Sequence, residues 1–319
     1  MRTEPMHEPV PAAAAVGMRR VAINGPTMGT RYSAVFYALP GVDLDAIGRA
    51  LAESVTEVDR QMSTWKPDSD LMRFNGAAVG EWVALPDRLL AVIEAGLDVG
   101  RATDGAFDIG LLDLVEAWGF NDHAHVPDPA AIARLATTIR RPAHEIVELD
   151  RRAGRAIKRA PIRIDLSGIA KGYGVDRLAE TLVCFGIEHF LVSIDGELRA
   201  AGGKADGTPW RVAVEQPDPA RRDVAGVVEL ADGALATSGN YRHRAVLDGR
   251  SFSHTMDPRT GRPVPDLVNS VTVRAPTCML ADAWASAVMV MGESEADPLL
   301  AERGLSAMTI GSGVDEPAL

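Results

Sequence analysis

The pattern of apolar and polar positions predicts helices in the first half of the chain and strands in the second. Apolar residues recur at helical spacing over 44–62, after the capping residue Asp43, and Pro86 is expected to open a second helix that runs to about Ala102. Alternating apolar residues, which are typical of half-buried strands, come mainly after residue 188. They lie in 189–194, 197–201, 210–215, 226–230, 233–237, 242–247, 251–254, 269–274 and 306–310. Helices and strands segregated in this way indicate an α+β fold.

One stretch in the middle of the chain, residues 162–182, combines a strand, a turn and a helix. Residues 162–166 alternate like a strand, Ser167 and Gly168 form the turn, and an apolar face at helical spacing follows. Such a turn exposes backbone N–H groups at a helix N-terminus, where an anion such as phosphate binds well. Asp165 and Lys171 place charges on either side of it. A plain strand–helix connection with two surface charges explains the stretch equally well.

Two other segments are candidate ligand loops. Residues 24–30, between strands expected over 21–23 and 31–39, are rich in small residues, which suits a hairpin loop or a close approach to a ligand. Residues 62–75 contain Trp65 in a polar run, so this tryptophan belongs either to a ligand loop or to the core. The loop 123–129 carries two histidines that we expect to face solvent, His123 and His125.

The composition is that of a soluble globular protein. The chain has 319 residues, of which 46% are hydrophobic and 24% charged, so it can bury a large core. Its formal net charge of -11 argues against nucleic-acid binding and means that an anionic ligand needs a metal ion or a helix N-terminus. No run of about 18 apolar residues occurs, so no membrane span is expected.

The start of the chain bears on location. Residues 1–18 read as a disordered leader, because acidic residues stand where an export signal has basic ones and the apolar run 12–16 is short. We therefore expect a cytoplasmic protein with a single domain over 19–319. Cys184 and Cys278 lie in apolar segments and are expected to be buried free thiols of a reducing compartment.

A candidate metal site lies on the apolar helix expected over 277–291. Asp282 and Ser286 are four residues apart and share one helical face. A carboxylate in such a segment is costly unless it is paired, protonated or bound to a metal ion. Carboxylate and hydroxyl oxygens are hard ligands, which suit Mg²⁺ better than Zn²⁺. A capping or core-polar Asp282 is the alternative.

His254 is a candidate general base. It stands at the end of an expected strand, before the turn-rich loop 257–263, where its residue type suits proton removal from a hydroxyl. A structural histidine bonded to the loop backbone explains this position equally well. The sequence contains no zinc-ligand spacing, Walker-type loop, Rossmann glycine motif after a strand or Gly-x-Ser-x-Gly elbow.

Seven motifs give the chain a resemblance to the ApbE family of FAD:protein FMN transferases. They occupy 28–30, 62–65 with 69–75, 105–108, 165–173, 236–241, 253–261 and 281–284. Each motif alone is weak. Together they stand in the family's order from about Met28 to Ile310, so the resemblance covers most of the chain.

The resemblance implies an ApbE-like α+β fold, related to the T-fold, with FAD in a cleft between a larger and a smaller lobe. It implies that eight residues contact the flavin substrate: Met28, Trp65, Ala106, Phe107, Asp108, Asp165, Lys171 and Met256. It also implies that the Asp282 and Ser286 side chains and the Gly168 backbone carbonyl bind Mg²⁺. His254 matches the residue expected to act as the base.

The implied activity is transfer of FMN from FAD to a Thr or Ser hydroxyl of a target flavoprotein, with release of AMP and with Mg²⁺ on the pyrophosphate. The expected partners are FAD and that target protein. Two other functions stay open, because the motifs do not determine which group attacks the FMN phosphorus of FAD. One is an FAD pyrophosphatase that yields FMN and AMP, and the other is a non-catalytic FAD-binding protein.

The chain departs from the family pattern in three respects. Ser286 stands where members usually have Thr, which keeps a hydroxyl. Residues 195–197, Asp-Gly-Glu, stand where Gly-Gly-Asp is common, which leaves the role of that loop open. Many members are exported lipoproteins, whereas this sequence shows no export signal or lipid-attachment cysteine, so the expected target is a cytoplasmic flavoprotein or a cytoplasmic segment of one.

Overall fold

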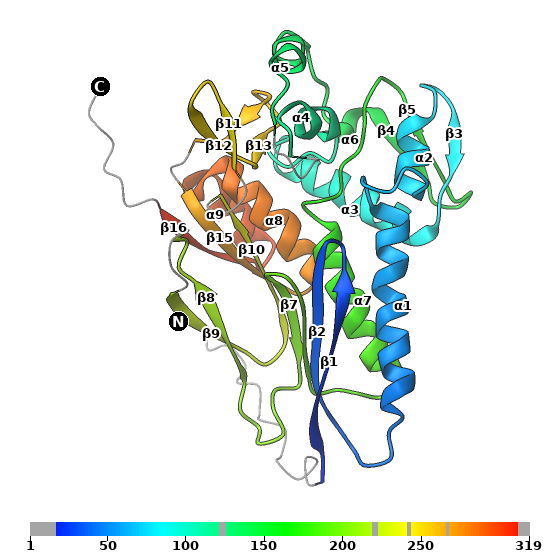
Figure 1. The fold of residues 1–319 in the computed structure, drawn as a ribbon, viewed down its shortest axis with the longest axis vertical. Helices are drawn as coiled ribbons and strands as arrows, with labels where there is room; N and C mark the ends of the chain where they lie inside the picture. Colours follow the sequence, from blue (N-terminus) through cyan, green and yellow to red (C-terminus); the bar gives the residue numbers. More distant parts are fainter. Residues whose placement is uncertain (1–16, 121–125, 219–222, 241–243, 266–267, 312–319) are drawn as a thin grey trace.

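A seven-stranded antiparallel sheet is the largest element of the fold (Figure 1). The computed structural model describes residues 17–120, 126–218, 223–240, 244–265 and 268–311. The strand order is β1-β2-β6-β7-β10-β15-β16. The strands are β1 (Arg19–Thr27), β2 (Thr30–Ala38), β6 (Phe190–Ile194), β7 (Glu197–Ala201), β10 (Gly233–Gly239), β15 (Val268–Ala275) and β16 (Ser306–Gly311).

Helices pack on one face of this sheet. They are α1 (Leu44–Met62), α7 (Ala170–Cys184) and α8 (Cys278–Met291), and α9 (Glu293–Glu302) packs against α8 and β16. Helix α1 begins as its sequence predicts, because Asp43 Oδ1 accepts a hydrogen bond from the Ala46 N–H at 2.9 Å. Its predicted apolar stripe is buried, and the predicted stripe of α7 is buried against it.

The opposite face of the sheet is covered in part by a two-stranded hairpin. Strands β8 (Trp210–Glu215) and β9 (Val224–Leu230) pair with each other. Trp210 and Leu230 are buried against Leu235 of β10 and Ala200 of β7. The central strands therefore have apolar side chains on both faces, as expected of strands buried between two layers.

A second group of elements lies at one end of the sheet (Figure 1). It contains α2 (Asp70–Gly76), α3 (Asp87–Ala102), α4 (Leu112–Ala117), α5 (Pro129–Ala136), α6 (Ala143–Ile146) and the small sheet β3 (Trp82–Ala84), β5 (Arg155–Lys158), β4 (Val147–Asp150). The hairpins β11 (Arg244–Leu247)–β12 (Arg250–Ser253) and β13 (Met256–Asp257)–β14 (Arg262–Pro263) complete the described elements. One apolar cluster runs from α3 into α8, so both groups share a core. The predicted α+β class is confirmed, while the two-lobe division and the leader stay predictions.

Both candidate ligand loops near the start of the chain are shorter than expected. The β1–β2 ladder continues to the pair Thr27–Thr30, so only Met28 and Gly29 form the turn, with φ of 45° and 73°. Within 62–75, Ser69 caps α2 by accepting a bond from Met72 N at 3.0 Å. The loop prediction was wrong for the parts that are strand and helix. His123 and His125 lie outside the described residues.

The strand expected over 162–166 does not form, since these residues belong to none of the described strands or sheets. Their backbone is instead bonded by a side chain, because Asn75 Oδ1 accepts from Ile164 N at 2.7 Å and Asn75 Nδ2 donates to Ile164 O at 2.8 Å. Asp165 N also donates to Ile109 O at 2.7 Å. The strand prediction was therefore wrong, although Ile164 and Leu166 are buried. The hydrogen-bond partners of this segment are an amide side chain and a loop instead of a neighbouring strand.

The two thiols differ in exposure. Cys278 is buried at the start of α8, as predicted, but Cys184 is exposed at the end of α7, so its predicted burial was wrong. Both thiols are free. Within the described ranges, none of the helices combines the length and apolar character needed to cross a bilayer.

Helices α7 and α8 approach each other closely at Gly172. A Cβ atom on Gly172 would stand 2.3 Å from the Cys278 carbonyl oxygen and 2.7 Å from Asp282 Cβ. Both distances are shorter than any van der Waals contact, and the first involves backbone that cannot rotate away. Glycine is therefore required where these two helices pack.

We expect Gly172→Ala to lower the free energy of unfolding by about 1–3 kcal/mol or more, because the added methyl forces the two helices apart. Urea denaturation with linear extrapolation measures this change.

Gly48→Ala in α1 is the matched control. A Cβ there meets only Ile23 side-chain atoms, at 3.9 and 4.0 Å, so this change should leave stability unchanged or raise it by up to about 1 kcal/mol. Equal losses in the two variants would contradict the requirement for glycine at 172.

Candidate active site

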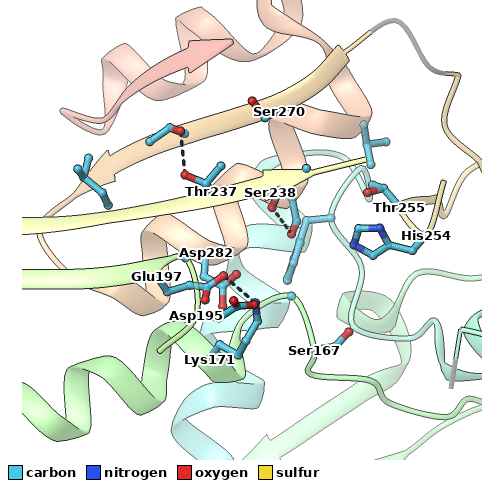
Figure 2. A pocket seen from close by; sticks show the side chains of 18 of the residues that line it. Ser167, Lys171, Asp195, Glu197, Thr237, Ser238, His254, Thr255, Ser270 and Asp282 are labelled. Carbon is cyan, nitrogen blue, oxygen red and sulfur yellow. Dashed lines mark hydrogen bonds and ion pairs between the residues drawn. The ribbon is translucent and has the colours of Figure 1, made fainter. Parts of the chain in front are cut away.

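A cavity of about 590 Å³ collects most of the residues that the sequence singled out. Its lining comes from segments far apart in the chain, between Ala106 and Val290. Ten of the twelve predicted site residues line it: Ala106, Phe107, Asp108, Asp165, Gly168, Lys171, His254, Met256, Asp282 and Ser286. Figure 2 shows Asp195, Glu197 and Asp282 gathered around Lys171, with His254 on the other side of the pocket.

Met28 and Trp65, both in the described part of the chain, are not among the lining residues. Met28 sits on the β1–β2 turn, and its Cε lies 3.0 Å from where a Cβ of Gly174 would stand, so it packs on α7. Trp65 lies between α1 and α2 with 53% of its surface exposed, so it is not a core tryptophan. Their contact with a flavin stays a prediction.

The turn before α7 is built around Asp165. One carboxylate oxygen accepts from Ser167 N at 2.8 Å and the other from Ser167 Oγ at 3.1 Å. Burial raises the pKa of Asp165, although both Ser167 bonds favour its charged form. The N–H groups of Ile169 and Ala170 donate to Leu166 O. The helix N-terminus therefore offers fewer amides to an anion than the sequence suggested.

Lys171 is held by a buried carboxylate. Its Nζ lies 2.8 Å from Glu197 Oε1 and 3.7 Å from Asp195 Oδ2. Burial opposes the charge of Lys171, but Glu197, Asp282 and Asp195 together hold its pKa above the usual value. Lys171 is thus a fixed positive charge in the cavity wall. This contact also answers the open question about residues 195–197, since Glu197 is the partner of Lys171.

Asp282 is buried in α8 and its carboxylate is held from α7. Its Oδ2 accepts a hydrogen bond from Gly172 N at 2.9 Å. Burial, with Glu197 nearby, raises the pKa of Asp282 to about 7, although Lys171 and the Gly172 N–H favour the charged form. A cation beside Asp282 would remove this cost by stabilising the carboxylate.

The three residues expected to bind a metal ion, Gly168, Asp282 and Ser286, all line the cavity. Gly168 lies against Ser286, since a Cβ at Gly168 would stand 3.2 Å from Ser286 Oγ and 3.3 Å from the Phe107 ring. No three Asp, Glu, His or Cys side chains of the described residues form a metal-binding group. One carboxylate, one hydroxyl and one backbone carbonyl are a hard donor set that suits Mg²⁺ better than Zn²⁺.

His254 lies on a loop that is bonded on both sides of it. Ser253 Oγ donates to Val264 O at 3.3 Å, and Thr255 Oγ1 donates to Asn240 Oδ1 at 2.7 Å. The imidazole meets Phe120 edge to face, with ring centroids 6.3 Å apart. These contacts hold the ring at the cavity wall, where a general base needs a fixed orientation.

The loop between α3 and α4 brings Phe107 and Asp108 to the cavity. Thr103 Oγ1 accepts from Phe107 N at 3.1 Å, which fixes the loop on the end of α3. Asp108 Oδ1 accepts from Gly110 N at 2.8 Å and Ala143 N at 3.1 Å. Burial raises the pKa of Asp108 despite these bonds. Asp108 therefore has a structural role in addition to facing the cavity.

Comparison with known proteins identifies the relatives of this fold and site. The model of the ApbE family matches residues 28–309. The chain belongs to the ApbE family. An FAD:protein FMN transferase of Vibrio cholerae serotype O1 is 40% identical over 280 residues, which cover 86% of this chain and 82% of that protein.

Solved structures support the ApbE-like fold. Flavin transferase ApbE from Vibrio cholerae superposes with a TM-score of 0.82 at 35% identity, over 93% of this chain and 95% of that chain. The apo form of Pseudomonas stutzeri flavinyl transferase ApbE gives a TM-score of 0.81 at 32% identity, over 93% and 92% of the two chains. The predicted family and its fold are confirmed.

Two polar residues of this ApbE-family protein, one in the cavity wall and one behind it, were not identified from the sequence. Ser238 Oγ lies 3.3 Å from Ser286 Oγ, and Asp176 of α7 accepts hydrogen bonds from the first amides of α8. Ser238 lies in the motif 236–241, from which no individual site residue was predicted. Asp176 stands one helical turn after Gly172, so the two residues share a face of α7. This spacing indicates an inward position, but the prediction for this helix considered only its apolar residues.

We expect Lys171→Met to lower the free energy of unfolding by about 2–4 kcal/mol, because it leaves the buried Glu197 carboxylate without its cation. One third of the Lys171 side chain is exposed, so the loss should fall short of that for a fully buried pair. Urea denaturation measures it, and adding Glu197→Gln should recover part of the loss.

Lys66→Met is the matched control, since Lys66 pairs with Asp59 at 2.6 Å but is 46% exposed. Its cost should stay within about 1 kcal/mol. If Lys171→Met lowers the free energy of unfolding no more than Lys66→Met does, Lys171 does not stabilise the buried Glu197 carboxylate.

Proposed function

We propose that this protein transfers FMN from FAD to a threonine or serine hydroxyl of a target flavoprotein and releases AMP, with Mg²⁺ as its metal ion. The observation that carries the proposal is the convergence of ten predicted site residues on one cavity. Curated relatives such as the Vibrio cholerae protein bear the name FAD:protein FMN transferase. The acceptor residue, the metal and the cytoplasmic location are the parts that rest on the sequence prediction alone.

Asp282, Ser286 and the Gly168 carbonyl would hold the magnesium ion. When bound, this ion would offset the negative charge of the FAD pyrophosphate and polarise its phosphoryl oxygens. The residues themselves have separate tasks. The Gly172 N–H orients the Asp282 carboxylate, and Lys171 adds a positive charge to the wall that a phosphate must approach.

His254 is the proposed base. Its imidazole nitrogen takes the proton from the acceptor hydroxyl, whose oxygen forms a bond to the FMN phosphorus of FAD. The bond between that phosphorus and the bridging oxygen breaks, and the bridging oxygen leaves with AMP. The product is FMN joined to the acceptor through a phosphoester bond. The Ser253 and Thr255 contacts keep the His254 backbone fixed during this transfer.

Intact-mass spectrometry of a flavin-acceptor domain tests the function. After incubation with this protein, FAD and MgCl₂, we expect the acceptor to gain one FMN while one AMP is released per FMN attached. The acceptor with its threonine changed to alanine is the control and should stay unmodified. AMP and free FMN with two different acceptors unmodified would indicate a pyrophosphatase, and unchanged FAD would indicate a binding protein.

The metal site gives a further prediction. Asp282→Ala should abolish Mg²⁺-dependent turnover of FAD while leaving the fold largely intact, because the only side-chain hydrogen bond of Asp282 within the described part of the chain is the one from Gly172 N. The free energy of unfolding should fall by no more than about 1–3 kcal/mol. AMP release against MgCl₂ concentration, with circular dichroism, measures both effects.

Ser286→Thr is the matched control because it keeps a hydroxyl on the same helical face. It should retain Mg²⁺-dependent turnover, whereas Ser286→Ala should weaken it. Normal turnover by Asp282→Ala would show that the metal site is misassigned.

A further inference from the structure

Helices α7 and α8 cap each other. Asp176 of α7 accepts hydrogen bonds from the first two amides of α8, with Oδ1 at 2.9 Å from Cys278 N and Oδ2 at 2.9 Å from Met279 N. Asp282 of α8 accepts from Gly172 N in the first turn of α7 at 2.9 Å. Each helix thus supplies a carboxylate to the N-terminal end of the other, where negative charge is favourable.

The two caps are one helical turn apart on both helices. Gly172 and Asp176 are separated by four residues, as are Cys278 and Asp282. The helices therefore run antiparallel at this contact, and the four residues form a closed set of contacts. Sliding α8 by one residue would move it about 1.5 Å along its axis and would break both caps together.

Asp176 is itself held in place. Arg199 of β7 donates to its Oδ1 at 2.8 Å, and Asp176 is only 4% exposed. Beside these caps, the two helices are in direct contact at Gly172, where a Cβ would stand 2.3 Å from the Cys278 carbonyl oxygen. The position of α8 along α7 is thus determined by a carboxylate that does not line the cavity.

We propose that Asp176 is a positioning residue for the metal site: by capping α8 it sets the register in which Asp282 and Ser286 face Gly168. This inference rests on the proposed function only in that those three residues are taken to hold Mg²⁺. Asp176 acts through the α8 backbone and contacts no substrate. Outer contacts that orient metal ligands typically change metal affinity by about 10- to 100-fold when they are removed.

Binding of Mn²⁺, which accepts the same oxygen ligands as Mg²⁺, tests the inference without turnover. Electron paramagnetic resonance of free Mn²⁺ gives the Kd for MnCl₂ with the full-length protein, with and without FAD. We expect Asp176→Asn to raise this Kd by about 10-fold or more. The Asn amide group presents a donor to one of the two α8 N–H groups, so one cap is lost and the register loosens.

Leu230→Ala is the control for general destabilisation. Leu230 is fully buried on the β8–β9 side of the sheet, away from α8, so its truncation should lower stability but leave the Mn²⁺ Kd within twofold of wild type. A second variant, Arg199→Gln, removes only the bond that holds Asp176 and should raise the Kd less than Asp176→Asn does.

A folded Asp176→Asn protein that binds Mn²⁺ as tightly as wild type would overturn the proposal. If that variant does not fold, an unchanged Kd in folded Arg199→Gln overturns it. Absence of Mn²⁺ binding by the wild type also overturns it. The acceptor assay on the wild type is run in parallel. If no FMN is transferred while Mn²⁺ binds and Asp176→Asn weakens binding, the proposed function fails and the positioning role stands.

Discussion

The backbone contact between α7 and α8 is the constraint on which the rest of the structure depends. It requires Gly172, because any side chain there would overlap the α8 backbone. It also places a carboxylate of each helix at the N-terminal end of the other, since Asp176 and Asp282 each accept hydrogen bonds from backbone N–H groups of the other helix. Buried carboxylates are costly without such partners. The same contact that completes the core therefore also orients a carboxylate toward the cavity.

Much of the fold was predictable from the sequence, because buried apolar positions recur with the period of a helix or a strand. The helical stripes of α1 and α7 and the alternating strands of the second half were predicted from apolar spacing, and α3 was predicted from Pro86. Errors arose where a polar group replaced a backbone partner. Residues 162–166 look like a strand, yet Asn75 supplies the bonds that a neighbouring strand would make. The spacing of apolar residues within one segment cannot reveal a hydrogen-bond partner that is as distant in the sequence as Asn75.

The site was predictable where its residues belong to local motifs and not where contacts decide their role. Asp165, Lys171, His254 and Asp282 stand in such motifs, Ser286 follows Asp282 by one helical turn, and the fold brings all five to one cavity. The partnership of Glu197 with Lys171 depends on how β7 lies beside α7, which no motif expresses. The number of N–H groups at the start of α7 that remain free to bind an anion also depends on the fold. Asp282 and the Leu166 carbonyl already accept hydrogen bonds from several of them.

The unequal exposure of the two thiols makes the protein suitable for distance measurements by spectroscopy. The chain has two cysteines, and only Cys184 is exposed. A maleimide dye should therefore attach at one place without any engineered residue. Cys184 ends the helix that begins beside Lys171, about 20 Å away along the axis at the usual helical rise. Energy transfer between this dye and FAD would test whether the flavin binds in the cavity, as proposed.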